Sequence, residues 1–195
     1  MATTATPLGA EPVNTLSASG SYTGTVRHIK IANAYGTAIF YGDFVKLVAA
    51  GTLEKAAVTT SVVAGTVGIF VGCSYTDPST SQLTFNQTFP ASTAADDIMA
   101  YVVDDPKLVF QMQGDEAIAQ TGLGNNVSAV STAGSTTIGR SKNALDGGSI
   151  ATTNTLPLRI VEFVDGPTSS VGDTYTDCLV TYLPLSHAYE TKLGV

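Results

Sequence analysis

Apolar and polar residues alternate with a period of two along most of this chain, which is the spacing of a half-buried β-strand and not of a helix. The clearest example is residues 107–113, where Leu108, Phe110 and Met112 share one face and Gln111 and Gln113 turn outward. The same analysis predicts further strands at residues 26–32, 43–48, 53–57, 66–75, 83–89, 98–103, 156–164 and 175–183.

Turn-forming residues separate these segments. Glycine, proline and aspartate gather at residues 49–52, 77–79, 104–106 and 165–167, where neighbouring strands would reverse direction. Many short strands with such turns indicate an all-β fold, with an antiparallel β-sandwich or a barrel-like core. Short helices are expected only around residues 115–120 and 186–193.

Two segments depart from this alternation. Residues 1–24 are polar and interrupted by prolines, and residues 122–155 are rich in Gly, Ser, Thr and Asn. We interpret the first as an extended N-terminal arm and the second as a long loop. Residues 25–195 would then form a single β-rich domain that contains this loop and ends in a short tail, 186–195. We expect the arm and the loop to contact neighbouring subunits.

Composition adds a constraint on the surface. Only 13% of the 195 residues are charged, against 44% that are hydrophobic, whereas about a quarter of an ordinary soluble domain is charged. Either much of the surface is neutral and rich in hydroxyl groups, or part of it is covered by other protein chains. The net charge of −7 argues against a surface for nucleic acid or for an anionic membrane, because both require a cationic face.

The chain lacks the features of an exported or membrane-spanning protein. No stretch approaches the roughly 20 apolar residues of a membrane span, and residues 1–24 contain no Lys or Arg, so no conventional signal peptide is expected. A protein made in a cytoplasm would keep Cys73 and Cys178 reduced. Both lie in alternating apolar runs, so we expect free buried thiols, with a disulfide as the alternative.

No catalytic signature stands out. The sequence lacks a phosphate-binding Gly-Lys-Ser/Thr loop, a Gly-x-Ser-x-Gly elbow and a paired-histidine zinc helix. His28 lies among cationic neighbours and is expected to be exposed or at an interface, and His187 is expected in a short terminal helix. The pairs Asp96–Asp97 and Asp104–Asp105 fit roles in turns or strand ends, because adjacent strand residues point to opposite faces. We therefore expect no enzyme activity, cofactor or metal.

Three segments carry a family resemblance. Residues 67–78 (VGIFVGCSYTDP), 100–106 (AYVVDDP) and 156–162 (LPLRIVE) resemble virion structural proteins of tailed bacteriophages, and within that group the chain is most similar to capsid decoration, or cement, proteins. The resemblance implies a homo-oligomer, with a trimer favoured, that binds the major capsid protein on the outside of the icosahedral shell and stabilises it. It implies assembly in the cytoplasm of a bacterial host, with no direct contact to nucleic acid or membrane.

The candidate contact residues are cationic. Arg27, His28 and Lys30 lie where the arm would leave the domain, and Arg140 and Lys142 interrupt the polar loop. Two alternatives remain open: another virion position, such as neck, tail or head fibre, or a non-enzymatic carbohydrate-binding or adhesion module. Sugar-binding platforms use exposed aromatic side chains, and this chain has no Trp but eight Tyr.

Overall fold

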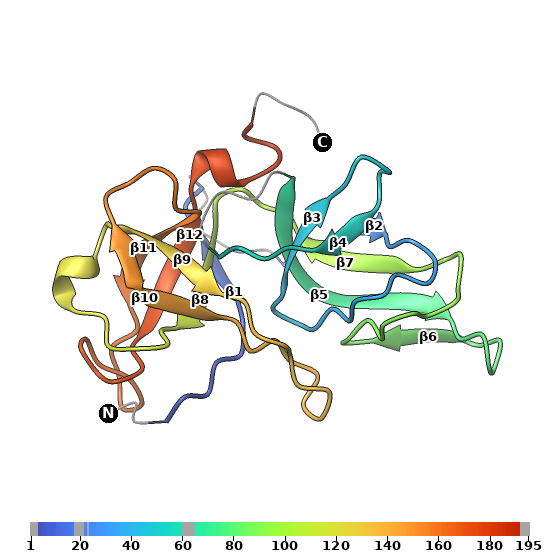
Figure 1. Ribbon diagram of the computed structural model, residues 1–195, viewed down its shortest axis with the longest axis horizontal. Helices are drawn as coiled ribbons and strands as arrows, with labels where there is room; N and C mark the ends of the chain where they lie inside the picture. Colours follow the sequence, from blue (N-terminus) through green and yellow to red (C-terminus); the bar gives the residue numbers. More distant parts are fainter. Residues whose placement is uncertain (1–3, 18–21, 23, 60–64, 192–195) are drawn as a thin grey trace.

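The computed structural model describes residues 4–17, 22, 24–59 and 65–191, which form two antiparallel β-sheets that pack against each other (Figure 1). The first sheet has six strands in the order β1 (Glu11–Thr15), β8 (Leu108–Gln113), β12 (Asp177–Tyr182), β11 (Leu158–Phe163), β9 (Asn126–Val130) and β10 (Ala144–Ala151). The second has the order β2 (Arg27–Lys30), β7 (Met99–Val103), β5 (Thr66–Thr76), β3 (Phe44–Leu47) and β4 (Leu53–Lys55), and β6 (Leu83–Asn86) pairs with β5. The predicted all-β class, with packed antiparallel sheets, is confirmed.

An aromatic group lies where the two sheets meet. Phe44 on β3 is 5.6 Å from Phe110 on β8 and 6.1 Å from Tyr182 on β12, measured between ring centroids, and all three side chains are buried. Edge-on aromatic pairs of this kind contribute about 0.5–1.5 kcal/mol each beyond the area that they bury. The alternation read from residues 107–113 therefore places its apolar face in the contact between the sheets.

The second sheet has a core on its other face as well. Phe70 and Val102 point away from the first sheet and are fully buried. The covering segments are the loops before β3 and after β6, which are joined by paired backbone hydrogen bonds between Ile39 and Phe89 at 3.1 and 2.8 Å. The second sheet thus has cover on both faces near its centre.

The N-terminal segment differs from the expected arm in one respect. Residues 11–15 are extended, as predicted, but they form β1 and pair with β8 of the same chain, with a register shift between Pro12 and Asn14. Proline is tolerated because β1 is an edge strand, where one row of backbone donors has no partner strand. The strand was not predicted because its polar residues and its proline interrupt the alternation of apolar and polar positions.

Residues 122–155, predicted as one long loop, contain two strands. β9 and β10 pair with each other, and Val127, Ala129 and Leu145 are buried. Their polar neighbours satisfy each other, since the Ser128 N–H donates to Ser149 Oγ at 2.9 Å and Asn126 Nδ2 donates to the Thr153 carbonyl at 2.7 Å. The connection between the strands, residues 131–143, remains a loop, as do the short flanks 123–125 and 152–155.

The two predicted short helices are wrong, because residues 115–119 and 187–191 form bends, turns and irregular backbone. Within the described residues the helical segments are 3₁₀ turns at Gln120–Gly122 and Pro184–Ser186. His187 follows the second turn, and the end of the predicted tail, residues 192–195, lies outside the described residues. No helix among the described residues has the length and apolar character needed to cross a membrane.

Candidate functional site

The far half of the second sheet presents an uncovered face. In the strand register, Lys30 on β2 lies opposite Met99 on β7, Met99 opposite Ser74 on β5, and Ser74 opposite Phe85 on β6. Residues paired in this way point to the same side of a sheet, so these four side chains form one row across four strands. Phe85 is 69% exposed.

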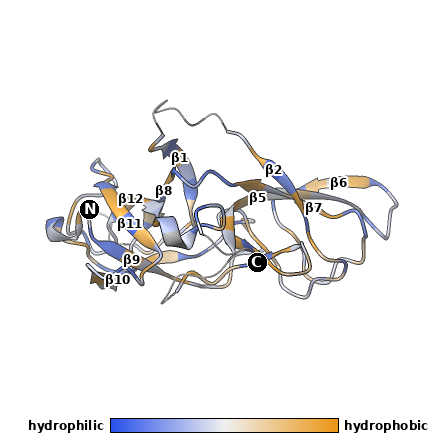
Figure 2. Ribbon diagram, turned by 90° about the horizontal axis from the view of Figure 1, so that it is seen from above, coloured by the Kyte–Doolittle hydropathy of each residue, from blue (hydrophilic) through white to orange (hydrophobic). Residues whose placement is uncertain are grey.

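Neighbouring positions extend this row into a surface. Leu83 lies two residues before Phe85 on β6 and is 61% exposed. On the cationic side, His28 is paired with Tyr101, and their ring centroids are 4.6 Å apart. We call the surface formed by His28, Lys30, Ser74, Leu83, Phe85, Met99 and Tyr101 the β6 face. Figure 2 shows β6 as a hydrophobic strand at the end of the molecule remote from β9 and β10.

The β6 face remains open because the first sheet covers only the near half of the second. Ile69 on β5 and Val103 on β7 share its side and are fully or almost fully buried against the first sheet. Further along the same strands, Ser74 and Met99 are only partly buried. The opposite side has Ala100 and Cys73 at 0% exposure in the second core. The fold therefore leaves an apolar strand with a cationic border in contact with solvent.

The five predicted contact residues divide into two groups. Arg27 forms an ion pair with Asp104, and Arg140 forms one with Glu11 at 2.6 Å while lying 4.7 Å from the centre of the Tyr41 ring. Arg140, whose side chain is 23% exposed, fastens the N-terminal strand, whereas the Arg27 side chain stays 62% exposed beside its partner. His28, Lys30 and Lys142 are exposed. The structure brings His28 and Lys30 together on the β6 face and places Lys142 in the connection between β9 and β10.

The aromatic and aliphatic members of the β6 face were missed in the sequence. Alternation in residues 83–89 marks Leu83 and Phe85 as one face of a strand, but it favours burial of that face and exposure of Thr84. The structure has the reverse arrangement. No signal in the local sequence shows which half of a sheet the partner sheet covers.

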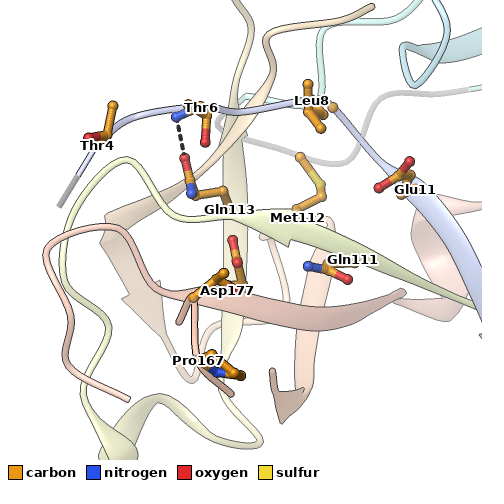
Figure 3. Close-up of a pocket in the computed structure, with 11 residues that line it drawn as sticks. Thr4, Thr6, Leu8, Glu11, Gln111, Met112, Gln113, Pro167 and Asp177 are labelled. Carbon is orange, nitrogen blue, oxygen red and sulfur yellow. Dashed lines mark hydrogen bonds between the residues drawn. The ribbon is translucent and has the colours of Figure 1, made fainter. Parts of the chain in front are cut away.

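A polar pocket lies at the other sheet, under the N-terminal segment (Figure 3). Its volume is about 470 Å³, and its lining includes Thr4, Thr6, Leu8, Gln113 and Asp177. The Thr6 N–H donates to Gln113 Oε1 at 2.7 Å, which ties the segment to β8. Burial raises the pKa of Asp177, and a hydrogen bond with Gln113 opposes that shift. None of the described lining residues is aromatic, so the pocket lacks the stacking platform of a sugar site.

Acidic residues meet at one exposed position that the sequence did not indicate. Carboxylate oxygens of Asp115, Glu116 and Asp146 lie within 4.8 Å of one another. Asp115 Oδ1 accepts from the Gly147 N–H at 3.0 Å, and Asp146 Oδ2 accepts from Ser128 Oγ at 3.3 Å. These hydrogen bonds account for the positions of the Asp115 and Asp146 carboxylates, which lie after β8 and at the β10 bulge.

The aspartate pairs serve turns and strand ends, as predicted. Asp97 accepts from Thr76 Oγ1 at 2.6 Å, which joins the end of β5 to the segment before β7. Asp105 accepts from the Lys107 N–H at 2.8 Å in the turn before β8. Each carboxylate therefore acts within its own turn or beside a strand end.

The buried thiols and the second histidine lie inside the domain. Cys73 and Cys178 are free and buried, as predicted, and burial raises the pKa of each thiol to about 12. His187, predicted in a short helix, is fully buried against Tyr182, and burial lowers its pKa. The backbone of Val67 and nearby carboxylates oppose that shift. None of these groups belongs to the β6 face.

Comparison with known proteins gave no match of any kind: no protein-family model, no curated protein and no solved structure is significantly similar to this chain.

Proposed function

We propose that this protein is a non-enzymatic structural protein of a tailed-bacteriophage virion, a decoration or cement protein that binds the outside of the capsid shell. The observation that carries the proposal is the β6 face, where Phe85 is 69% and Leu83 61% exposed beside the exposed cation Lys30. A chain with so few charges gains by covering such a surface with another protein. The resemblance of residues 67–78, 100–106 and 156–162 to virion proteins directs the choice of partner.

The partner in this proposal is the major capsid protein, bound through an apolar patch with acidic groups at its border. Phe85 would insert among apolar side chains, and Lys30 would face a carboxylate. Central aromatic contacts dominate the affinity of many interfaces, and truncation of such a residue costs about 2 kcal/mol or more. Repetition over many equivalent sites on a shell makes even a modest contact effective.

The test is co-sedimentation of the purified protein with shells assembled from the major capsid protein of the same virus. We expect the wild-type chain to sediment with shells and Phe85→Ala to bind about 30-fold more weakly, which corresponds to a loss of about 2 kcal/mol. Leu123→Ala is the matched control, because Leu123 is 44% exposed in the turn remote from β6. Wild-type protein that stays in the supernatant, or two variants that bind equally, would contradict the proposal.

The N-terminal arm needs a shorter truncation than residues 1–24. Deletion of the whole segment would remove β1 and the ion pair of Glu11 with Arg140, and would therefore damage the domain. Deletion of residues 1–5 leaves both intact. If the arm contacts neighbouring subunits, this variant will fold normally and bind shells more weakly. The proposed trimer is checked separately by the mass of the protein in solution.

The nearest alternative is another virion position, such as neck, tail or head fibre. It predicts association with that structure and no sedimentation with shells. A carbohydrate-binding module predicts glycan binding by the isolated chain. The aliphatic and aromatic β6 face suits a protein partner better than a sugar, since its most exposed side chains include a leucine.

A further inference from the structure

A buried carboxylate touches both a lysine amine and an asparagine amide. Asp43, at 0% exposure, has Oδ2 2.8 Å from Lys55 Nζ. Its other oxygen, Oδ1, accepts from Asn143 Nδ2 at 3.2 Å. The amine and the amide nitrogen therefore share one carboxylate, although Lys55 belongs to β4 in the second sheet and Asn143 immediately precedes β10 in the first.

The carboxylate is held in a fixed orientation by further donors. The Phe40 N–H donates to Oδ2 at 2.9 Å, and Ser141 Oγ donates to Oδ1 at 2.7 Å. The Asn143 side chain is fixed at both ends, because its Oδ1 accepts from the Thr132 N–H at 3.0 Å. If a nucleophile added to the Asn143 side-chain carbon, Oδ1 would become negative. The Thr132 N–H already donates to this oxygen and would stabilise that charge, as an oxyanion donor does.

Water has little access to this group. The Lys55 side chain is 14% exposed, and Asn143 is 2% exposed. The Phe40 ring lies 5.9 Å from Lys55 Nζ and covers the amine on one side. Exclusion of water removes the competing nucleophile, which favours attack by lysine.

We propose that Lys55 and Asn143 are joined by an isopeptide bond that forms without an added reagent. Lys55 gives one proton to Asp43, and the neutral amine adds to the Asn143 side-chain carbon. The Asp43 carboxyl gives this proton to the departing amide nitrogen, which leaves as ammonia, and the second proton lost by the Lys55 nitrogen is taken up by that ammonia to give ammonium. One C–N bond forms, one breaks, one molecule of ammonia leaves, and no oxidant or reductant is required.

This bond would connect the two sheets covalently. It joins β4 to the segment before β10, beside backbone hydrogen bonds from the Ser141 N–H to the Tyr41 carbonyl and from the Ala129 N–H to the Val58 carbonyl. A cross-link there would resist separation of the sheets under load. The inference rests on the Asp43 group alone and is independent of the proposed partner.

The test is the mass of the intact, denatured full-length chain after purification and incubation. We expect a mass below that of the sequence by one ammonia, and a proteolytic fragment in which the peptide with Lys55 is joined to the peptide with Asn143. Lys55→Arg keeps a cation for Asp43 but removes the amine, and is expected at its full sequence mass. Lys142→Arg, a change of an exposed neighbour of Asn143, is the control and is expected to lose ammonia like the wild type.

Two results would overturn the proposal. One is wild-type protein at its full sequence mass after prolonged incubation. The other is loss of ammonia that persists in Lys55→Arg, which would identify a cyclic imide at an asparagine in place of a cross-link. Asp43→Asn tests the proton carrier and should stay unlinked while showing a native β-sheet spectrum. If that variant does not fold, the wild-type and Lys55→Arg masses still decide the question.

Discussion

A comparison of one exposed and one buried phenylalanine tests whether the β6 face is uncovered in the monomer. Phe85 is 69% exposed on β6, whereas Phe110 is at 0% exposure between the sheets, 5.1 Å from the ring centroid of Tyr182. The same substitution, Phe→Ala, at these two positions changes the chemistry equally. The difference in the free energy of unfolding therefore reports only on how much of each ring the fold covers.

The structure sets the size of this difference. Removal of a buried phenylalanine costs about 3–5 kcal/mol, because the cavity collapses only partly. Phe85 has about a third of its surface covered, so at about 25 cal/mol per Å² and roughly 200 Å² per ring its loss costs no more than about 1.5 kcal/mol. We expect Phe110→Ala to lower the Tm by about 6–20 °C, at 2–4 °C per kcal/mol for a chain of this size.

Equilibrium unfolding in urea measures both values, provided that the dependence of free energy on urea concentration is unchanged between variants. A cost for Phe85→Ala equal to that for Phe110→Ala would refute the reasoning, since it would mean that β6 is covered within the monomer. The docking surface would then have to be sought elsewhere. A small cost at Phe110 would instead show that the aromatic group between the sheets does not stabilise their contact.

Three further predictions concern the interior. Burial keeps the pKa of His187 below its ordinary value of 6.5, so the folded state binds fewer protons than the unfolded state. The free energy of unfolding should therefore fall as the pH drops through 6.5, and His187→Asn should weaken this pH dependence. Cys73 and Cys178, with thiol pKa values raised to about 12, should react with a thiol reagent at neutral pH only after denaturation, and rapid labelling of native protein would contradict their burial. Gly9 and Gly51 have φ of +76° and +72°, so alanine at either position costs about 1–2 kcal/mol of backbone strain. Gly9→Ala should cost about 1–3 kcal/mol more than Gly51→Ala, because the new Cβ would lie 2.5 Å from a neighbouring side-chain atom. At Gly51 nothing lies within 4 Å of the new Cβ. Equal losses for the two alanine variants in thermal unfolding would be the contrary result.

Most of the strands could be predicted from the sequence. Every segment with regular alternation, such as residues 107–113, forms a strand that lies within its predicted bounds or exceeds them by one residue, as β5 does at Thr76. The strands that were missed, β1, β9 and β10, lack that regularity. Their polar side chains are satisfied by partners distant in the sequence, as when Asn126 Oδ1 on β9 accepts from Arg159 Nε, and such partners cannot be identified before the fold is known.

The candidate site, the β6 face, could be predicted from the sequence only in part. His28 and Lys30 were expected at an interface because they lie where the N-terminal arm would leave the domain, and the structure leaves both exposed. Arg27 and Arg140 were chosen as contact residues too, but they are paired with Asp104 and Glu11. Charge alone does not distinguish a free cation from one that fastens a strand, because the distinction depends on which carboxylate lies within reach.

By itself, the sequence determined the all-β class, the buried free thiols and the low charge, because a period of two and the residue composition are local properties. Only the tertiary structure decided which faces are covered. Leu83 and Phe85 have the pattern of a buried face, yet they are exposed because the first sheet ends before it reaches β6. Asp43, Lys55 and Asn143 become one buried group only when two sheets meet, because contacts between distant segments depend on how the chain folds and not on local spacing.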